Sequence, residues 1–294
     1  MSTITTQFVN EDGACFTQWV ISDPEAATAL TITPERGGMI TGFTLDGEDF
    51  IWRRHPNFGR CERPRFGVPV LFPSCGKPEG GVHHFESGDC PMEIHGLADL
   101  AGWNVKSVGP DGVTLELKAT PLTKFLYPFD FVVLMNYTLE GNTAALRMTV
   151  RNCGEVPMPF SFGYHPYFAV SALENVSVRV KCATCADDFA GEQVPAPETI
   201  TSLPIDRTKD STICVMQGVQ FPMVMEDSGN GHRVTVQADE HFHNGVLWQQ
   251  SHENFICVEP WNGWPNSVNE EGRHEILQPG EELTSVWTMT IEKI

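Results

Sequence analysis

Hydrophobic and polar residues alternate with a period of two along several segments of the chain. In residues 113–119 (VTLELKA), every second side chain from Val113 to Leu117 is apolar. This alternation predicts a strand with one buried face. The segments 131–140 and 144–152 show strand character on either side of a Glu-Gly-Asn turn. They therefore predict a β-hairpin.

Further segments of this kind continue to the end of the chain, whereas no stretch of twelve or more residues keeps a helical apolar stripe. Glycines (26) and prolines (21) separate the segments at intervals typical of short antiparallel strands. In the last segment, Trp287, Met289 and Ile291 fall on one face. The further predicted strands are 176–182, 232–238, 245–250, 255–260 and 285–294. The pattern predicts one all-β domain over residues 1–294, a sandwich rather than a closed barrel.

The stretch 52–105 differs from the rest because it contains few clear strands and many glycines, prolines, arginines and histidines. Loops of this length in a compact domain are usually functional or disordered. This one includes the apolar runs GVPVLFP and MEIHGLADLAGW, which can pack against a core. We therefore expect an ordered segment that contributes to a site.

Charge limits the partners that the protein can bind. The net charge is -19, from 19 Lys and Arg against 38 Asp and Glu. Such a field repels phosphate backbones and anionic lipid surfaces, so neither nucleic acid nor membrane is an expected partner. A neutral small molecule is the expected ligand. A β-sandwich of this size is compatible with a monomer or a homodimer.

Cysteine usage points to a reducing compartment. The nine cysteines are odd in number and scattered, and the N-terminal MSTITTQFVN is polar throughout, so a cytoplasmic location is predicted. Cys182 and Cys185 have the spacing of metal ligands, but no second pair or Cys/His partner set is evident. We interpret them as two thiols near a turn, and we expect neither a metal nor a cofactor.

Two titratable residues lie in unusually apolar surroundings. His165 lies within SFGYHPYF (161–168), where Pro166 favours an extended backbone and Gly163 permits close approach. Glu259, in FICVEPWNGWPN, follows an apolar strand and precedes Trp261. A buried carboxylate beside aromatics is a candidate general base. A hydrogen-bonded core histidine and a glutamate at a solvent-exposed rim remain the alternatives.

Two further residues fall in the stretch 52–105. His95, in MEIHGLAD, precedes a glycine that allows tight packing, and Glu93 could orient its ring. Arg65, in RPRFGVPVLFP, could bind hydroxyl or carboxylate oxygens through its guanidinium, or form a surface ion pair. His83 and His84 lie beside a Gly-Gly turn and are expected to be exposed.

These residue types together suit proton transfer at two positions of a neutral, polyhydroxylated ring. The chain has no GxGxxG, P-loop or GxSxG motif and no evident nucleophile. A carbohydrate-binding protein without catalysis could use the same residues. A cupin-like metal enzyme is a third possibility, because His241 and His243 of HFH would share one face of a strand.

The chain resembles the aldose 1-epimerase (galactose mutarotase-like) family. The resemblance is carried by RFGVPVLFP, IHGLAD, FSFGYHPYF and ICVEPW, which occur in the family's order over roughly residues 30–290. It implies a large antiparallel β-sandwich of the supersandwich type, catalysis without a metal, and a sugar cleft. The implied reaction is interconversion of the α and β anomers of a hexose, with a hexose-6-phosphate as the alternative substrate.

The resemblance also implies roles for individual residues. Glu259 matches the family's general base, and His165 matches its general acid. His95 matches a second substrate-binding histidine near the ring oxygen. Arg65 resembles a substrate-contacting arginine. Apart from the resemblance, an aromatic side chain such as Trp261 would stack on the apolar face of the sugar. The family's hydroxyl-binding aspartate is placed at Asp210, with Asp206 as its rival.

One position departs from the family pattern. Relatives often read HGFAR where this chain reads HGLAD, which puts Asp99 in the place of an arginine. Arginines bind the phosphate in the hexose-6-phosphate branch, so this change argues against a sugar phosphate. Arg60, Arg63 and Arg65 remain as candidate anion contacts.

Overall fold

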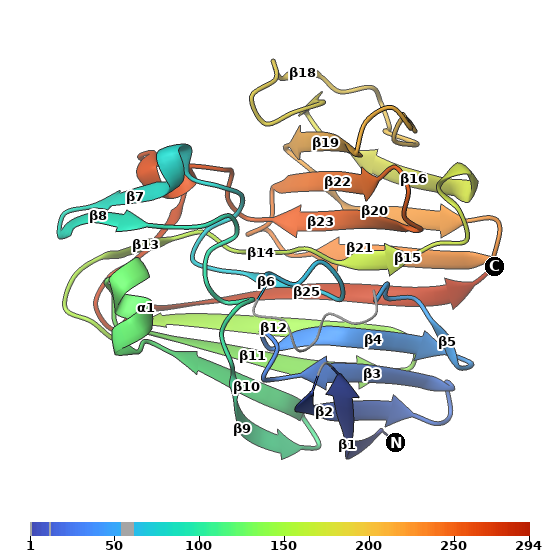
Figure 1. The fold of residues 1–294 in the computed structure, drawn as a ribbon, viewed down its shortest axis with the longest axis horizontal. Coiled ribbons are helices and arrows are strands. Elements are labelled where there is room, and N and C mark those ends of the chain that lie inside the picture. Colours follow the sequence, from blue (N-terminus) through green and yellow to red (C-terminus); the bar gives the residue numbers. More distant parts are fainter. Residues whose placement is uncertain (1, 12, 54–61) are drawn as a thin grey trace.

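The computed structural model of the chain describes residues 2–11, 13–53 and 62–294. Antiparallel strands make up most of these residues and form two eight-stranded sheets, one five-stranded sheet and two strand pairs (Figure 1). The predicted all-β sandwich is confirmed.

The first eight-stranded sheet is built around the predicted hairpin. Its strands pair in full register, with Phe131 opposite Asn152 and Glu140 opposite Thr143. The sheet has the order β16-β20-β21-β25-β12-β11-β10-β9. Its strands are β9 (Asn104–Gly109), β10 (Gly112–Lys118), β11 (Phe131–Glu140), β12 (Thr143–Asn152), β16 (Val176–Lys181), β20 (Gln220–Asp227), β21 (His232–Ala238) and β25 (Glu282–Lys293).

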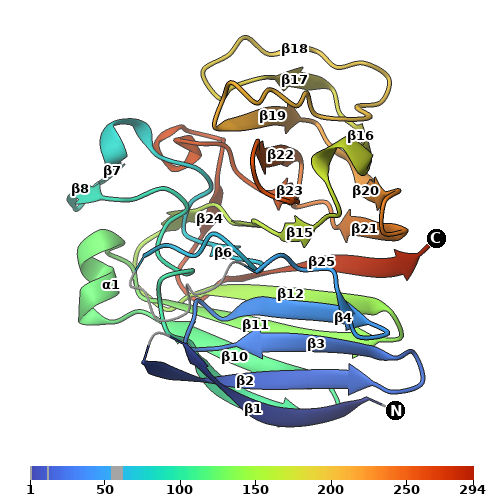
Figure 2. The same cartoon turned by 45° about the vertical axis from the view of Figure 1, so that its right-hand side comes forward.

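The N-terminal residues form a separate sheet that the alternation pattern did not predict. This five-stranded sheet has the order β1-β2-β3-β4-β5 and lies beside β10–β12 (Figure 2). Its strands are β1 (Thr3–Glu11), β2 (Ala14–Asp23), β3 (Thr28–Thr33), β4 (Met39–Leu45) and β5 (Glu48–Asp49).

The second eight-stranded sheet carries the residues singled out for chemistry. Its order is β18-β17-β19-β22-β23-β14-β6, and β15 pairs with β23 beside β14. Its strands are β6 (Val70–Leu71), β14 (Gly163–Tyr164), β15 (Tyr167–Ala169), β17 (Thr184–Ala186), β18 (Val194–Pro195), β19 (Ser211–Gln217), β22 (Asn244–Gln250) and β23 (Phe255–Trp261).

The remaining elements are short. The strand pairs are β13 (Met158–Phe160) with β24 (Glu275–Leu277), and β7 (Val82–Phe85) with β8 (Gly88–Pro91). The α-helix α1 (Pro121–Leu126) begins at a capping box formed by Thr120 and Thr123. The 3₁₀ turns are Glu79–Gly81, Leu173–Asn175 and Ser267–Asn269. None of the helices in the described residues has the length and apolar character needed to cross a bilayer.

One continuous apolar core joins the three main sheets. Trp287, Met289 and Ile291 of β25 are fully buried in it, as their shared face predicts. Phe43 of β4 and Val258 of β23 belong to the same core, so it reaches from the N-terminal sheet to the sheet that carries the site. All residues of β23 are buried, so close packing holds its backbone and side chains rigidly.

Candidate active site

A cavity of about 360 Å³ lies over the sheet that contains β22 and β23. This volume is within the range of small-molecule sites. One part of its wall is charged or polar and another part is apolar. The lining includes Arg63, Arg65, Lys77, His95, Asp99, His165, Tyr167 and Glu259 on the polar side, and Phe189, Ile213, Val246, Trp248, Trp261 and Pro265 on the apolar side. The stretch 52–105, which was expected to contribute to a site, therefore supplies several of the lining residues that the structure describes.

His165 is placed in the cavity by an interruption in the sheet. It lies between β14 and β15, where Pro166 has no N–H to continue the ladder. The His165 amide donates to the carbonyl of Pro69 at 3.0 Å, which fixes the backbone. Its ring stacks on Tyr167 with centroids 4.7 Å apart and meets Trp248 edge-on. The imidazole thus has one orientation, set by backbone and packing.

Glu259 is the fifth of the seven residues of β23 and lies opposite Val246 of β22. Its side chain is only 1% exposed, and Cys257 and Trp261 share its face of the strand because side chains alternate along a strand. The indole N–H of Trp261 donates to Glu259 Oε2 at 3.0 Å. Trp261 is itself buried, so it holds the carboxyl group in place.

His165 and Glu259 face each other directly. The distance from His165 Nε2 to Glu259 Oε1 is 3.4 Å. Burial lowers the pKa of His165 to about 3, and the nearby cations Arg65 and Arg63 act in the same direction. Burial raises the pKa of Glu259 well above its usual value, although the Trp261 hydrogen bond partly opposes this. Both shifts favour the neutral forms of the two side chains, the protonated carboxyl group of Glu259 and the uncharged imidazole of His165.

We expect the ring of His165 to stay neutral at a pH of about 5, where a histidine with the ordinary pKa of roughly 6.5 is mostly protonated. Burial disfavours the charged ring, so its folded pKa is depressed. NMR titration of protein labelled in the histidine rings measures this, with His165→Asn assigning the signal. A ring that titrates at the ordinary value would contradict the neutral pair.

His95 joins the same site from the segment between β8 and β9. Its ring lies edge-on to His165 and to Trp261, with centroids 5.3 Å and 5.6 Å away. Glu93 was expected to orient the ring, but the partner of Nδ1 is the amide of Gly76, which donates at 3.2 Å. Because Nδ1 accepts, the ring proton belongs on Nε2, and that atom can donate to a ligand.

The arginines divide into two groups. Arg65 is exposed at the cavity and remains available to a ligand, together with Lys77. Arg63 instead forms an ion pair with the buried Asp99, which was singled out from the sequence as a departure. Arg60 lies outside the described residues.

Asp210 and Asp206 do not lie at the cavity. Neither is among its lining residues, and Asp210 is exposed. The backbone carbonyl of Asp210 accepts from the amide of Ser251, and the carboxylate of Asp206 accepts from the amide and hydroxyl of Thr208. Asp206 stabilises a turn before β19 and Asp210 bonds to the residue after β22, so the placement of the hydroxyl-binding aspartate at either position has no support from this geometry.

Several lining residues were not singled out from the sequence. Trp248 alternates with Val246 on β22, and the hairpin to β23 brings both beside Glu259. A register drawn for the predicted strands 245–250 and 255–260 could have found them. Phe189 stacks on Trp261 with centroids 5.5 Å apart and an interplanar angle of 9°. It comes from an irregular segment after β17, for which the sequence carries no periodic signal.

The donor set for a metal ion is limited. Among the described residues, His165, Cys257 and Glu259 form a group whose ligand atoms lie within 4.8 Å of one another. Burial raises the pKa of the Cys257 thiol well above its usual value, and the nearby Glu259 adds to this, so the protonated thiol is favoured over the thiolate that binds metals. Burial likewise raises the pKa of Cys182 to about 11, which fits a structural thiol.

Two interpretations of other histidines were wrong. His241 and His243 precede β22 rather than lying on a strand, so they do not share a strand face. His241 instead faces Glu275, with 3.7 Å between Nδ1 and Oε1. His83 is fully buried on β7, although His84 is exposed as expected.

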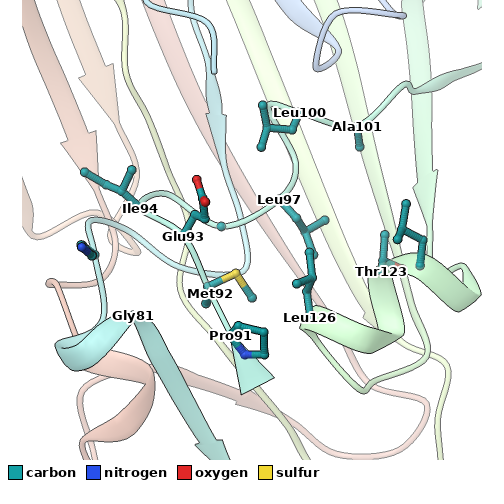
Figure 3. Close-up of a pocket in the computed structure, with 13 residues that line it drawn as sticks. Gly81, Pro91, Met92, Glu93, Ile94, Leu97, Leu100, Ala101, Thr123 and Leu126 are labelled. Carbon is teal, nitrogen blue, oxygen red and sulfur yellow. The ribbon is translucent and has the colours of Figure 1, made fainter. Parts of the chain in front are cut away.

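A second hollow, of about 680 Å³, lies beside the cavity between residues 91–101 and α1 (Figure 3). Its walls are mainly aliphatic, from Met92, Leu97, Leu100 and Leu126. Lys77 and Ile94 line both hollows, so the second hollow adjoins the cavity.

Comparisons with known proteins find matches over most of the chain. The family model described as aldose 1-epimerase matches residues 18–290. The chromosomal protein LacX of Lactococcus lactis subsp. lactis is 26% identical, over 87% of this chain and 91% of LacX.

Solved structures share the fold at low sequence identity. Slr1438 from Synechocystis sp. PCC 6803 superposes with a TM-score of 0.87 at 22% identity, over 94% of this chain and 96% of that chain. A galactose mutarotase related enzyme from Lactobacillus acidophilus superposes with a TM-score of 0.80 at 22% identity, over 94% of this chain and 97% of that chain. At these identities the likeness shows the fold.

Proposed function

Because this chain belongs to the aldose 1-epimerase family, we propose that it interconverts the α and β anomers of a hexose by acid/base opening and reclosure of the ring. The observation that carries the proposal is the 3.4 Å contact between His165 Nε2 and Glu259 Oε1 in a cavity of sugar-sized volume. General acid and base groups must lie within reach of the atoms whose protons they move.

The proposed steps use a single proton on the pair. When sugar binds, the Glu259 proton moves to His165 Nε2 across the 3.4 Å contact, leaving a carboxylate and an imidazolium. The carboxylate takes the proton of the anomeric hydroxyl, and His165 donates to the ring oxygen as the C1–O5 bond opens. The free aldehyde rotates about C1–C2, and reclosure on the other face reverses both transfers.

The remaining lining residues have supporting roles in this proposal. His95 donates from Nε2 to the ring oxygen, and Arg65 donates to a sugar oxygen. Trp261 orients Glu259 through its indole N–H, in addition to the stacking predicted from the sequence. Trp248 offers a second aromatic face to the apolar side of the sugar. We infer that residues 1–294 act as one domain, since the lining extends from Arg63 to Pro265.

A hexose phosphate is the second candidate substrate, favoured by one observation. The charge of Asp99 is offset by Arg63, so Arg65 and Lys77 are left facing the cavity. These two cations could bind an anionic group. We also propose a reducing location such as the cytoplasm, because all eight cysteines in the described part of the chain are free.

The test is an anomer-exchange assay by NMR with free and phosphorylated hexoses. We expect the wild-type protein to raise the rate of interconversion of at least one of these sugars well above the rate in buffer. Calorimetry on the same sugars identifies the alternative: affinity without any rate enhancement would indicate a carbohydrate-binding protein and would refute the enzyme.

A further inference from the structure

We propose that the ion pair between Arg63 and Asp99 is a positioning device that holds the backbone and ring of His95 in the cavity. The proposal deepens the proposed function and rests on it for the role of His95. Asp99 stands where the family pattern has an arginine. In this structure it forms an ion pair with Arg63, a cation from a different part of the chain.

The contacts connect Asp99 to the residue after His95. The Asp99 side chain is 1% exposed and accepts from Arg63 Nη1. The second guanidinium nitrogen, Nη2, donates to the carbonyl of Gly96 at 2.9 Å. One planar fork therefore binds a buried carboxylate and the backbone next to His95 at the same time.

His95 needs such support because its backbone is unusual. Its φ of 68° lies in the left-handed region, which few non-glycine residues occupy without compensation. Its amide donates to the carbonyl of Gly76 at 2.7 Å, and Nδ1 accepts from the Gly76 amide at 3.2 Å. These two bonds hold the backbone and ring of His95 to Gly76. The bond from Arg63 to the Gly96 carbonyl holds the backbone that follows His95.

The pair also affects the charge of His95. Burial lowers the pKa of His95 well below its usual value, and His165 and then Arg63 contribute in the same direction. Burial raises the pKa of Asp99 to about 6 against the opposing effect of Arg63, so the pair is ionised at neutral pH. The other charged groups around the ring are Arg65, Lys77 and Glu259 in the cavity and Glu93 two residues earlier.

Two substitutions separate position from charge. Arg63→Met removes both the fork and the cation, so we expect kcat to fall by about tenfold to a hundredfold and the pKa of His95 to rise. Arg63→Lys keeps the cation but cannot make both bonds, so kcat should also fall while the pKa of His95 stays near its wild-type value. Arg233→Met, which removes an ion pair with Glu226 outside the cavity lining, is the matched control and should leave both quantities unchanged.

The measurements are kcat and KM by anomer exchange, and titration of the His95 ring by NMR with His95→Gln as the assignment standard. If Arg63→Lys and Arg63→Met both keep kcat within twofold and leave the His95 signal in place, the positioning role is wrong. If the wild-type protein catalyses no interconversion, the proposed function fails. A changed chemical shift of the His95 ring in Arg63→Lys, at a pKa near the wild-type value, would still show that the pair holds the ring. If Arg63→Met does not fold, Arg63→Lys alone tests the positioning role.

Discussion

Glu259→Gln should lower the rate of anomer interconversion by about a thousandfold, within the range that general acid or base groups supply. Glutamine keeps the shape of the side chain, and its amide oxygen can still accept from the indole of Trp261. It cannot take or carry the proton that the pair shares. His165→Asn should cause a similar loss, because the proton then has no second site.

The two losses should not add. A proton that moves between two groups is lost to catalysis when either group is removed, so the double variant should be about as slow as each single one. Sugar affinity, measured by calorimetry, should change little by comparison. NMR exchange between the anomers gives the rates.

The chain contains a natural control for this experiment. His241 and Glu275 form another histidine–glutamate contact, at 3.7 Å, and neither residue lines the cavity. His241→Asn and Glu275→Gln should therefore leave the rate near that of the wild type. Near wild-type rates in Glu259→Gln and His165→Asn would refute the assignment, as would equal losses in the two pairs.

Gly96→Ala should destabilise the fold by about 3 kcal/mol or more, through overlap with the backbone. Gly96 has a φ of 80°, and an added Cβ would lie 2.2 Å from the carbonyl oxygen of Phe72. That oxygen already accepts from the amides of Leu97 and Ala98, so it cannot move without loss of both bonds. Since Gly96 follows His95, the remaining folded protein should also lose activity.

Gly47→Ala is the matched control for this substitution. Gly47 has nearly the same φ, 81°, but an added Cβ would meet no atom within 4 Å. Gly47→Ala should lower the free energy of unfolding only by the cost of placing alanine in the left-handed region, about 1 to 2 kcal/mol. Denaturant unfolding of both variants gives the two free energies. Equal losses would show that the contact with Phe72 does not constrain this turn.

The sequence predicted the fold where alternation was regular and missed it where alternation was weak. The hairpin of β11 and β12 was found nearly to the residue, because one face of each strand is buried and the other is polar. In β4, five consecutive residues from Met39 to Phe43 are buried, so the strand shows no period of two. The strand β4 was missed for this reason, whereas β2 has only two fully buried residues and so presents no regular apolar face.

The site was predictable in its residue types but not in its contacts. His165, Glu259 and His95 were identified by their apolar or glycine-rich surroundings, and the structure brings them to one cavity. The pairing of Arg63 with Asp99 joins two segments without periodic structure, so no register could predict it. Asp210 was placed by a loose local match, and a loop aspartate of this kind carries no signal of where it points.

The location of Glu259 has a consequence for how such a protein can change. It lies on a strand that is hydrogen-bonded to β22 on one side and to β14 and β15 on the other, whereas Phe189 and Arg65 lie on irregular segments. Substitutions, insertions and deletions are tolerated far better in irregular segments than in a central strand. Under the proposed function, the choice of sugar can therefore diverge among descendants of this chain while the groups proposed to transfer protons are inherited intact.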